Sequence, residues 1–332
     1  MNNKIKILMK KTGLGEILEE PKRIKGGLSH RMYKVVTNKG TYAVKELNSN
    51  IMKRKTAYSN FQMSEEIADK AKKEGIPVVS AIKIENNIIT KVDEQYYMIF
   101  EWLDGKILKA EEITKEHCKT IGKILGKIHS INFNNIRKEE MPDEKIKIFD
   151  WEKYIKISKQ EKKTYYSLLE ENKEPFEKLN EKTIIAVKES KKKQVISHRD
   201  LDIKNVMWKE NKPFIIDWEA SGYINPTVET ISTAYYWSGG ETEQLDQLKF
   251  ETFLKSYKEN SNIPIDTEVK TLIYADFYGK LNWLEYNLKR TIEDEYDQEE
   301  KELAENEVIK SIKDIKYNLS QINKIIKILE KE

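Results

Sequence analysis

The sequence contains a single cysteine, Cys118, among its 332 residues, which excludes an intrachain disulfide. Its four histidines (His30, His117, His129 and His198) are too scattered for a Cys/His zinc site. No run of about 18 uncharged apolar residues is present, the length that a membrane-spanning helix needs. The first residues are basic but include no apolar segment of signal-peptide length. We therefore expect a cytoplasmic protein, because a chain without disulfides is typical of a reducing compartment, and no membrane partner.

Net charge is also small, because 59 basic residues are balanced by 56 acidic ones and the sum is +3. The balance is uneven along the chain: residues 1–100 hold 19 basic and 11 acidic residues, which leaves 40 and 45 for the rest. This asymmetry indicates an anionic ligand on the first part of the chain. Solvated lysine and glutamate faces explain it equally well. We expect no nucleic-acid partner.

Up to about residue 100, short β-type runs separated by glycine and asparagine predict a small antiparallel sheet. The tripeptide NKG at 38–40 predicts a hairpin turn. One helix is expected to interrupt the sheet, from about Thr56 to Lys73, because Gly75 and Pro77 are typical of the end of a helix. The runs expected as strands are RMYKVVTN (31–38), TYAVKEL (41–47), NIITKV (87–92) and QYYMIFEW (95–102).

After the segment FEWLDG (100–105), apolar residues recur every three to four positions, which is typical of helices. At 115–130 a single apolar stripe predicts a helix with one buried face. The fold class is therefore α+β, with a β-rich part, a larger and mainly helical part, and no internal repeat. The stripe consists of Cys118, Ile121, Leu125 and Ile128; further helices are expected at about 160–190, 241–260, 266–290 and 298–331, and short β-runs at 194–197 and 214–217.

The most informative residues follow these two β-runs, in the segment HRDLDIKN (198–205) and at Asp217, twelve residues after Asn205. Phosphoryl transfer needs a carboxylate that orients the attacking hydroxyl and accepts its proton, and oxygen ligands that hold Mg²⁺ on the phosphates. Asp200 fits the first role, and Asn205 with Asp217 fits the second. The alternative is that His198 and Asp200 pair within a loop and that Asp217 merely ends a strand.

The spacing H-R-D-L-x-x-x-N, with a carboxylate after the next apolar β-run, matches the catalytic loop that kinases share. On these residues the chain resembles the aminoglycoside phosphotransferase and choline kinase-like family of small-molecule kinases. The resemblance covers nearly the whole chain and implies a bilobal protein kinase-like fold, Asp200 and His198 in the catalytic loop, and ATP and Mg²⁺ as cofactors. It also implies a nucleotide-binding lobe at 1–100, a hinge at 101–105 and a catalytic, substrate-binding lobe at 106–332.

Upstream residues extend the resemblance. Lys45, in the run AVKE, looks like the strand lysine that meets the α- and β-phosphates. Such a lysine needs a carboxylate partner, and the following helix offers Glu65 and Glu66. We favour Glu65, because it shares a helix face with Phe61 and Ala68.

The segment IKGGLSH (24–30) occupies the place of the loop that covers the phosphates. Gly26 and Gly27 allow the backbone to approach an anion closely, and Ser29 offers a hydrogen-bond donor. A hairpin turn would need the same glycines. The pattern is not the G-x-G-x-x-G of protein kinases, which favours the small-molecule branch.

The segment YMIFEWLDG (97–105) resembles the hinge between the lobes. There an adenine would bond to backbone groups, with the carbonyl of Glu101 and the amide of Leu103 as the candidates. Because a hinge reads the base through its backbone, the choice between ATP and GTP stays open.

Two departures separate the chain from protein kinases. The run DWE at 217–219 replaces D-F-G and no A-P-E follows, so the segment that presents a peptide is missing. Asp202 stands where a protein kinase has a lysine. The D-x-E form is like that of choline and methylthioribose kinases, in which both acids can serve metal, so Glu219 is either a second metal ligand or a structural hydrogen-bonding group.

The sequence says least about the acceptor. Aromatic residues on later helical segments offer a box for a quaternary amine, although most are expected to be core. Nine acids at 293–307, against one base, would attract a polyamine-like acceptor or form a solvated turn. The aromatic residues are Tyr235, Tyr236, Trp237, Phe277, Tyr278, Trp283 and Tyr286.

We therefore predict an ATP- and Mg²⁺-dependent phosphotransferase that acts on a hydroxyl group of a small molecule, with an aminoglycoside-like, amino alcohol or sugar-like acceptor. The alternatives are a protein kinase and a non-catalytic nucleotide-binding or coat-associated protein of the same fold. The complete set of chemical residues argues against the non-catalytic alternative. The last helix is expected to pack on its own chain, and both a monomer and a homodimer stay open.

Overall fold

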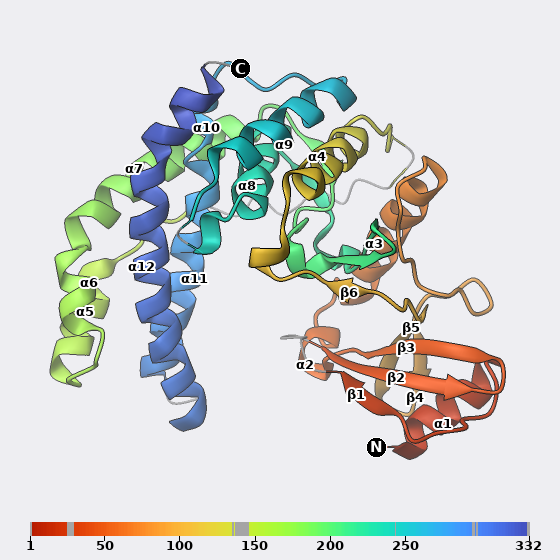
Figure 1. Cartoon of the computed structure of the whole chain (residues 1–332). Coiled ribbons are helices and arrows are strands. Elements are labelled where there is room, and N and C mark those ends of the chain that lie inside the picture. The colour runs from red at the N-terminus through yellow and green to blue at the C-terminus, as the bar shows by residue number, and fades with distance from the viewer. Residues whose placement is uncertain are drawn as a thin grey trace. The chain divides into compact units, whose positions relative to one another are not determined.

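The structure is a computed structural model that describes residues 2–24, 30–134, 136, 146–242, 244–293, 296 and 298–330. The chain divides into two compact units (Figure 1). Unit 1 comprises the residues up to Lys109, a short stretch that begins at Ile131, and His198–Gly222. Unit 2 comprises the remaining segments, including everything from Tyr223 onward. None of the helices in the described part of the chain is long and apolar enough to cross a membrane.

Unit 1 is built on a five-stranded antiparallel sheet with the strand order β1-β2-β3-β5-β4. The predicted hairpin at 38–40 is confirmed, since Thr37 pairs with Gly40 across a two-residue turn. The helix predicted after this hairpin is also confirmed, and Gly75 beyond its end has a left-handed backbone (φ 83°). The bounds are β1 (Lys22–Ile24), β2 (Arg31–Thr37), β3 (Gly40–Glu46), α2 (Ser49–Met52), α3 (Ala57–Lys73), β4 (Thr90–Val92), β5 (Gln95–Glu101) and β6 (Lys106–Ile107).

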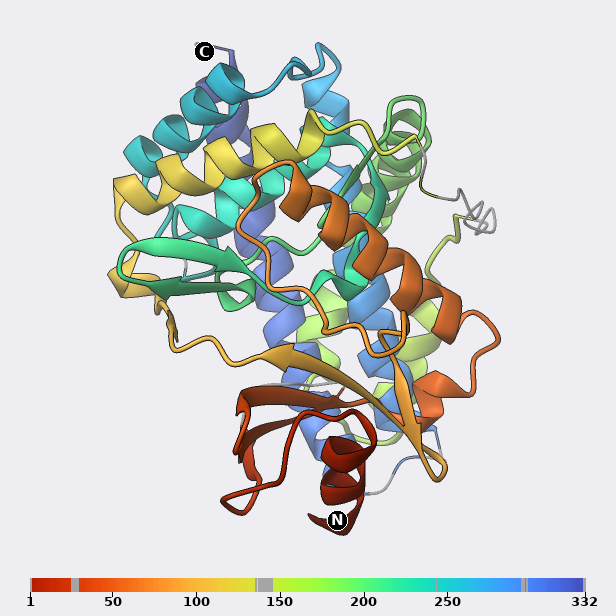
Figure 2. The ribbon, with the colours of Figure 1, turned by 90° about the vertical axis from the view of Figure 1, so that its right-hand side faces the viewer.

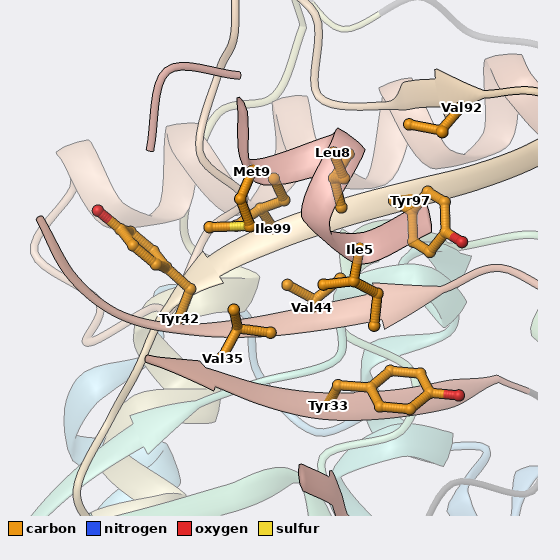
Figure 3. Close-up of a cluster of buried hydrophobic side chains, with 10 residues drawn as sticks. All are labelled: Ile5, Leu8, Met9, Tyr33, Val35, Tyr42, Val44, Val92, Tyr97 and Ile99. Atoms are coloured by element: carbon orange, nitrogen blue, oxygen red, sulfur yellow. The ribbon is translucent and has the colours of Figure 1, made fainter. Parts of the chain in front are cut away.

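An N-terminal helix that the sequence patterns did not predict, α1 (Asn2–Lys11), covers one face of this sheet. Its residues Ile5, Leu8 and Met9 are fully buried and pack against strand residues such as Val44 and Ile99 (Figure 3). The spacing i, i+3, i+4 puts the three on one helix face. The first sheet face is thereby closed.

Side chains of a strand alternate between the faces of a sheet, so the neighbours of Val44 point to the opposite face from α1. There Leu47, Phe61 of α3 and Met98 form a second buried cluster. Lys45 is paired with Met98 across β3 and β5 and therefore lies on this second face. The alternation of β3 is what directs Lys45 away from the α1 core.

The second part of unit 1 is a small sheet in which β6, β8 (Val206–Lys209) and β9 (Lys212–Ile215) are antiparallel. Glu210 and Asn211 form the tight turn between β8 and β9, both with positive φ (50° and 61°). Two short 3₁₀ helices flank this hairpin: η2 (Ile203–Asn205) before it and η3 (Trp218–Ala220) after it. The loop after α3 also joins β9, because the amide of Ile215 donates to the carbonyl of Pro77 at 2.7 Å.

Unit 2 is mainly helical, and its helices α11 and α12 run side by side (Figure 1). The predicted stripe of helix α4 is confirmed, because all four of its residues are fully buried. The bounds are η1 (Ala110–Glu112), α4 (Lys115–His129), α5 (Trp151–Gln160), α6 (Tyr166–Glu171), α7 (Lys173–Ser190), β7 (Val195–Ser197), β10 (Gly222–Ile224, starting at the end of unit 1), α8 (Pro226–Trp237), η4 (Gly240–Thr242), α9 (Gln247–Asn260), α10 (Val269–Leu272), α11 (Ala275–Ile292) and α12 (Gln298–Leu329).

Helix α4 lies directly against α9 (Figure 2). Two glycines allow this approach: a Cβ at Gly122 would lie 2.4 Å from the carbonyl oxygen of Phe253, and one at Gly126 would lie 2.8 Å from that of Tyr257. A buried polar network joins the same helices, in which His129 contacts Glu229 of α8 at 2.8 Å and the Tyr257 hydroxyl at 2.9 Å. Because each group is buried with a partner, the network costs less than isolated polar groups would.

The predicted helix at 160–190 is divided in the structure, with α5 beginning earlier, at Trp151, and α7 following α6 after Asn172. The predicted β-run at 87–92 is a strand only from Thr90. Ile88 and Ile89 are nevertheless buried, which explains why the run reads as apolar.

Candidate active site

The β8–β9 hairpin brings the predicted metal ligands Asn205 and Asp217 to one end. Asn205 directly precedes β8 and Asp217 follows β9, and antiparallel strands place the start of one beside the end of the other. The pairing is direct, because the amide of Ile216 donates to the carbonyl of Asn205 at 3.0 Å. Two positions twelve residues apart are thus neighbours.

Asn205 also holds the predicted catalytic carboxylate. Its Nδ2 donates to the backbone oxygen and to Oδ2 of Asp200, both at 2.8 Å, and its own side chain is buried. Directing Nδ2 at Asp200 leaves Oδ1, the atom that a metal would need, on the other side of the amide. Burial raises the pKa of Asp200, and the charge of Lys204, 3.6 Å from Oδ1, opposes that rise.

His198 is fully buried and fixes the loop that carries Asp200. The amide of Asp200 donates to His198 Nδ1 at 3.3 Å, so the ring proton lies on Nε2, which donates to the carbonyl of Ile216 at 3.0 Å. The ring also lies edge-on to Trp218, 4.8 Å between centroids. In this structure His198 is therefore a positioning group between the loop and the end of β9.

The backbone of the site is unusual at two residues. Arg199 and Asp217 both have left-handed conformations, with φ of 66° and 59°. Such conformations in residues other than glycine cost about 1 kcal/mol or more and persist where surrounding contacts impose them. Arg199 lies within the predicted catalytic segment 198–205 and Asp217 is a predicted metal ligand, and strained residues typically gather in active sites.

Lys45 contacts both predicted metal-binding acids. Its Nζ lies 2.9 Å from Oδ1 of Asp217 and 2.6 Å from Oε2 of Glu219, and its side chain is only 10% exposed. Burial disfavours the charged ammonium, but the two carboxylates outweigh it and raise the pKa of Lys45. The two acids are therefore close enough to share one cation.

Glu65 is not the partner of Lys45 in this structure. Its carboxylate accepts a hydrogen bond from the amide of Ala81 at 2.8 Å, and burial raises its pKa to about 7. A buried acid that is about half-protonated near pH 7 attracts an ammonium less than the two carboxylates together, which explains why Lys45 contacts Asp217 and Glu219. Glu66, the alternative partner, is exposed on α3. A role of Glu65 toward nucleotide stays a prediction.

Glu219 is held by two donors on one oxygen. Besides Lys45, the ring Nε2 of His30 lies 3.3 Å from Oε2. Burial would raise the pKa of Glu219, but the hydrogen bond from His30 and the charge of Lys45 lower it to about 2. Sequence patterns gave His30 no role of its own, because its contact is with a residue 189 positions away.

The donor chemistry fits magnesium. Mg²⁺ is usually held by one or two carboxylates together with substrate phosphates, and Asp217, Glu219 and the Oδ1 of Asn205 offer only oxygen. Among the described residues, no three His, Cys, Asp or Glu side chains are grouped closely enough to hold a metal ion by themselves. A metal here would thus depend on the amide of Asn205 and on phosphate oxygens.

The remaining predicted site residues are placed only in part. Gly26, Gly27 and Ser29 lie outside the described residues. Glu101 ends β5 and is exposed, and Leu103 lies half-buried in the link to β6. Of the aromatic residues in unit 2, Tyr235, Trp237 and Phe277 are buried, Tyr236 and Tyr278 are half-buried, and Trp283 and Tyr286 are each 45% exposed.

Comparison with known proteins places the chain in a class. The sequence matches the phosphotransferase enzyme family over residues 20–259. Among solved structures, the chain is similar to a spectinomycin phosphotransferase in complex with ADP and spectinomycin (TM-score 0.68, 16% identity, 97% of each chain covered). It is also similar to an amicoumacin kinase in complex with AMP-PNP and Ca²⁺ (0.63, 12%, 95% of this chain and 96% of that one). A choline kinase from Cryptosporidium parvum is a further neighbour (0.56, 16%, 97% of each).

No curated protein has a significantly similar sequence. Because the family match covers most of the chain, the chain belongs to the phosphotransferase enzyme family. It is a phosphotransferase, and its fold is the mixed α+β fold of the neighbours. The resemblance seen in the motifs is thus confirmed.

Proposed function

We propose that this protein is an ATP- and Mg²⁺-dependent kinase for a hydroxyl group of a small molecule. The observation that carries the proposal is that one ammonium, Lys45, is shared by Asp217 and Glu219 beside the Asn205 and Asp200 pair. Two acids that already share a cation offer a ready position for a divalent one. The nucleotides and Ca²⁺ named in neighbouring structures support the same cofactors.

Within this proposal the chain's own residues divide the work. Asp200 orients the acceptor hydroxyl and accepts its proton, and Asn205 holds the carboxylate in place. Lys45 binds the α- and β-phosphates, Glu65 supports it, and Gly26, Gly27 and Ser29 cover the phosphates. Asn205, Asp217 and Glu219 would hold Mg²⁺, which when bound would supply charge neutralisation on the phosphates. The adenine would bond to the carbonyl of Glu101 and the amide of Leu103.

For the acceptor we propose an aminoglycoside-like, amino alcohol or sugar-like molecule. Neighbouring structures are named for spectinomycin and choline phosphorylation, which supports this range. Trp283 and Tyr286 of α11, with ring centroids 5.5 Å apart, are exposed aromatic groups that would attract an amine or stack on a sugar. We keep 1–100 and 106–332 as the lobes and 101–105 as the hinge, and we propose a cytoplasmic location, where ATP is available.

The test is a phosphoryl-transfer screen with Mg²⁺ and ATP and a panel of aminoglycosides, choline, ethanolamine, methylthioribose, homoserine and simple sugars. Asp200→Asn serves as the paired variant, and we expect it to bind ATP normally while turnover falls at least about 10²-fold. Acceptor-dependent ADP release that is lost in the variant would support the proposal. A wild-type protein that binds no nucleotide, or a variant with unchanged turnover, would refute it.

A further inference from the structure

His30 is a buried histidine that the catalytic roles above leave unassigned. It directly precedes β2, and only 8% of it is exposed. Its ring lies edge-on to Phe61 of α3, with centroids 5.7 Å apart and planes at 63°. The ring thus packs against Phe61, and each of its two nitrogens faces a hydrogen-bond partner.

The hydrogen bonds of His30 determine which nitrogen carries the proton. The backbone amide of Asn48 donates to Nδ1 at 3.0 Å. A nitrogen that accepts a hydrogen bond has no proton of its own, so the neutral ring carries its proton on Nε2. This Nε2–H lies 3.3 Å from Oε2 of Glu219 and donates to it. His30 therefore joins the turn after β3 to the acid of η3.

We propose that His30 is a positioning residue that fixes the carboxylate of Glu219 for metal binding. The inference rests on the proposed function and deepens it. Oε2 already accepts from His30 and from Lys45, and these contacts leave Oε1 as the oxygen available to a metal. Partners of this kind typically change metal affinity about 10- to 100-fold when they are removed.

The two donors to Glu219 differ in what they do when nucleotide binds. Lys45 is charged, and in the proposed function its ammonium binds the α- and β-phosphates and no longer pairs with Glu219. His30 is anchored on its other side by the amide of Asn48, so it is the donor that remains. Without it, Glu219 would regain side-chain freedom in the ligand-bound state, and metal binding would have to remove that freedom.

In a purely structural role, the important contact would be on the other side of the ring, where Nδ1 accepts a hydrogen bond from the amide of Asn48. Two substitutions separate the roles. The amide of Gln reaches about as far as Nε2 and keeps a donor for Glu219, whereas the amide of Asn reaches about as far as Nδ1 and keeps an acceptor for Asn48. The positioning role predicts that His30→Gln recovers metal dependence and that His30→Asn does not. A structural role predicts the reverse order.

The measurement is calorimetric titration of ATP into the full chain with and without MgCl₂, which needs no acceptor. The readout is the dissociation constant of ATP without MgCl₂ divided by the dissociation constant with MgCl₂. The midpoint of thermal unfolding is the control for folding. We expect His30→Asn to lower this ratio about 10-fold and His30→Gln to stay within about 2-fold of wild type. In a Glu219→Gln background, His30→Asn should have no further effect on this ratio, because the metal-binding carboxylate that His30 positions is already absent.

Three results would overturn the positioning role: an unchanged ratio in His30→Asn, an equal loss in His30→Gln, or full additivity with Glu219→Gln. If wild-type protein binds ATP with the same affinity with and without Mg²⁺, the proposed function is refuted instead. Nitrogen-15 NMR of the ligand-free protein tests the geometry separately. We expect His30 to be protonated on Nε2 and its resonance to move in Glu219→Gln, and protonation on Nδ1 would contradict the inference.

Discussion

Glu65 allows a quantitative test of the electrostatics of the candidate site. Its pKa rises from 4.5 to about 7 because the side chain is buried and the amide of Ala81 compensates only in part. Between these two pH values the folded protein keeps the proton that the unfolded chain has lost. The contribution of Glu65 to stability is therefore largest below pH about 4.5, falls as pH rises through about 7, and stays low above. At about 1.4 kcal/mol per pKa unit, the full loss is about 3 kcal/mol.

Glu65→Gln removes this pH dependence, because the amide still accepts from Ala81 and carries no charge. We expect the variant to match wild type near pH 4.5 and to exceed its unfolding free energy by about 3 kcal/mol at pH 9. Urea denaturation across this range measures the difference, with the exposed neighbour Glu66→Gln as control. The reasoning is refuted if Glu65→Gln follows wild type at every pH. ATP titration adds an opposite expectation: the stabilised variant should bind ATP more weakly, because in the proposed nucleotide complex the carboxylate of Glu65 supports Lys45.

Three further predictions concern other parts of the chain. Asp217→Asn should reduce ATP affinity in Mg²⁺ to its value without Mg²⁺, measured by calorimetry, and a persistent Mg²⁺ effect would contradict the metal role. Gly122→Ala should cost about 1–3 kcal/mol in urea denaturation, because α4 and α9 must separate; Gly279→Ala, with open space around its Cβ, should cost nothing. Lys204→Met should move the acidic limb of the pH profile of kcat/KM to higher pH, since it removes a charge that lowers the pKa of Asp200, while the exposed Lys209→Met should not.

The features that the sequence predicts well depend on residues close together in the chain. The hairpin at 38–40 and the buried stripe of α4 follow from local turn chemistry and from helical spacing, and both are confirmed. The segment 198–205 and Asp217 are also close in the sequence, and the roles predicted for them depend on that spacing. A short antiparallel hairpin between them brings Asn205 beside the end of β9. For these elements the spacing in the sequence already predicts which residues are neighbours, and the structure supplies the distances between them.

The features that were missed depend on contacts between distant residues. Helix α1 has three buried residues, Ile5, Leu8 and Met9, but four lysines among its ten residues conceal that short stripe. The partner of Lys45 could not be chosen from helical periodicity, because periodicity gives the face of Glu65 and not its charge. Burial decides that charge, and burial depends on how α3 packs over the sheet.

The same argument explains the pairing of Lys45 with Asp217 and Glu219. The two carboxylates are stabilised by a positive charge, and the buried ammonium of Lys45 contacts both. Burial keeps Glu65 about half-protonated near pH 7, which limits the negative charge around one lysine. In the proposed nucleotide complex, Mg²⁺ would replace the ammonium between the two acids, and a freed Lys45 would favour the ionised form of Glu65. Proton release from Glu65 should therefore accompany binding of ATP with Mg²⁺ near pH 7, and calorimetry in buffers of different ionisation enthalpy measures it. Glu65→Gln should abolish this release, and its persistence in that variant would assign it to another group.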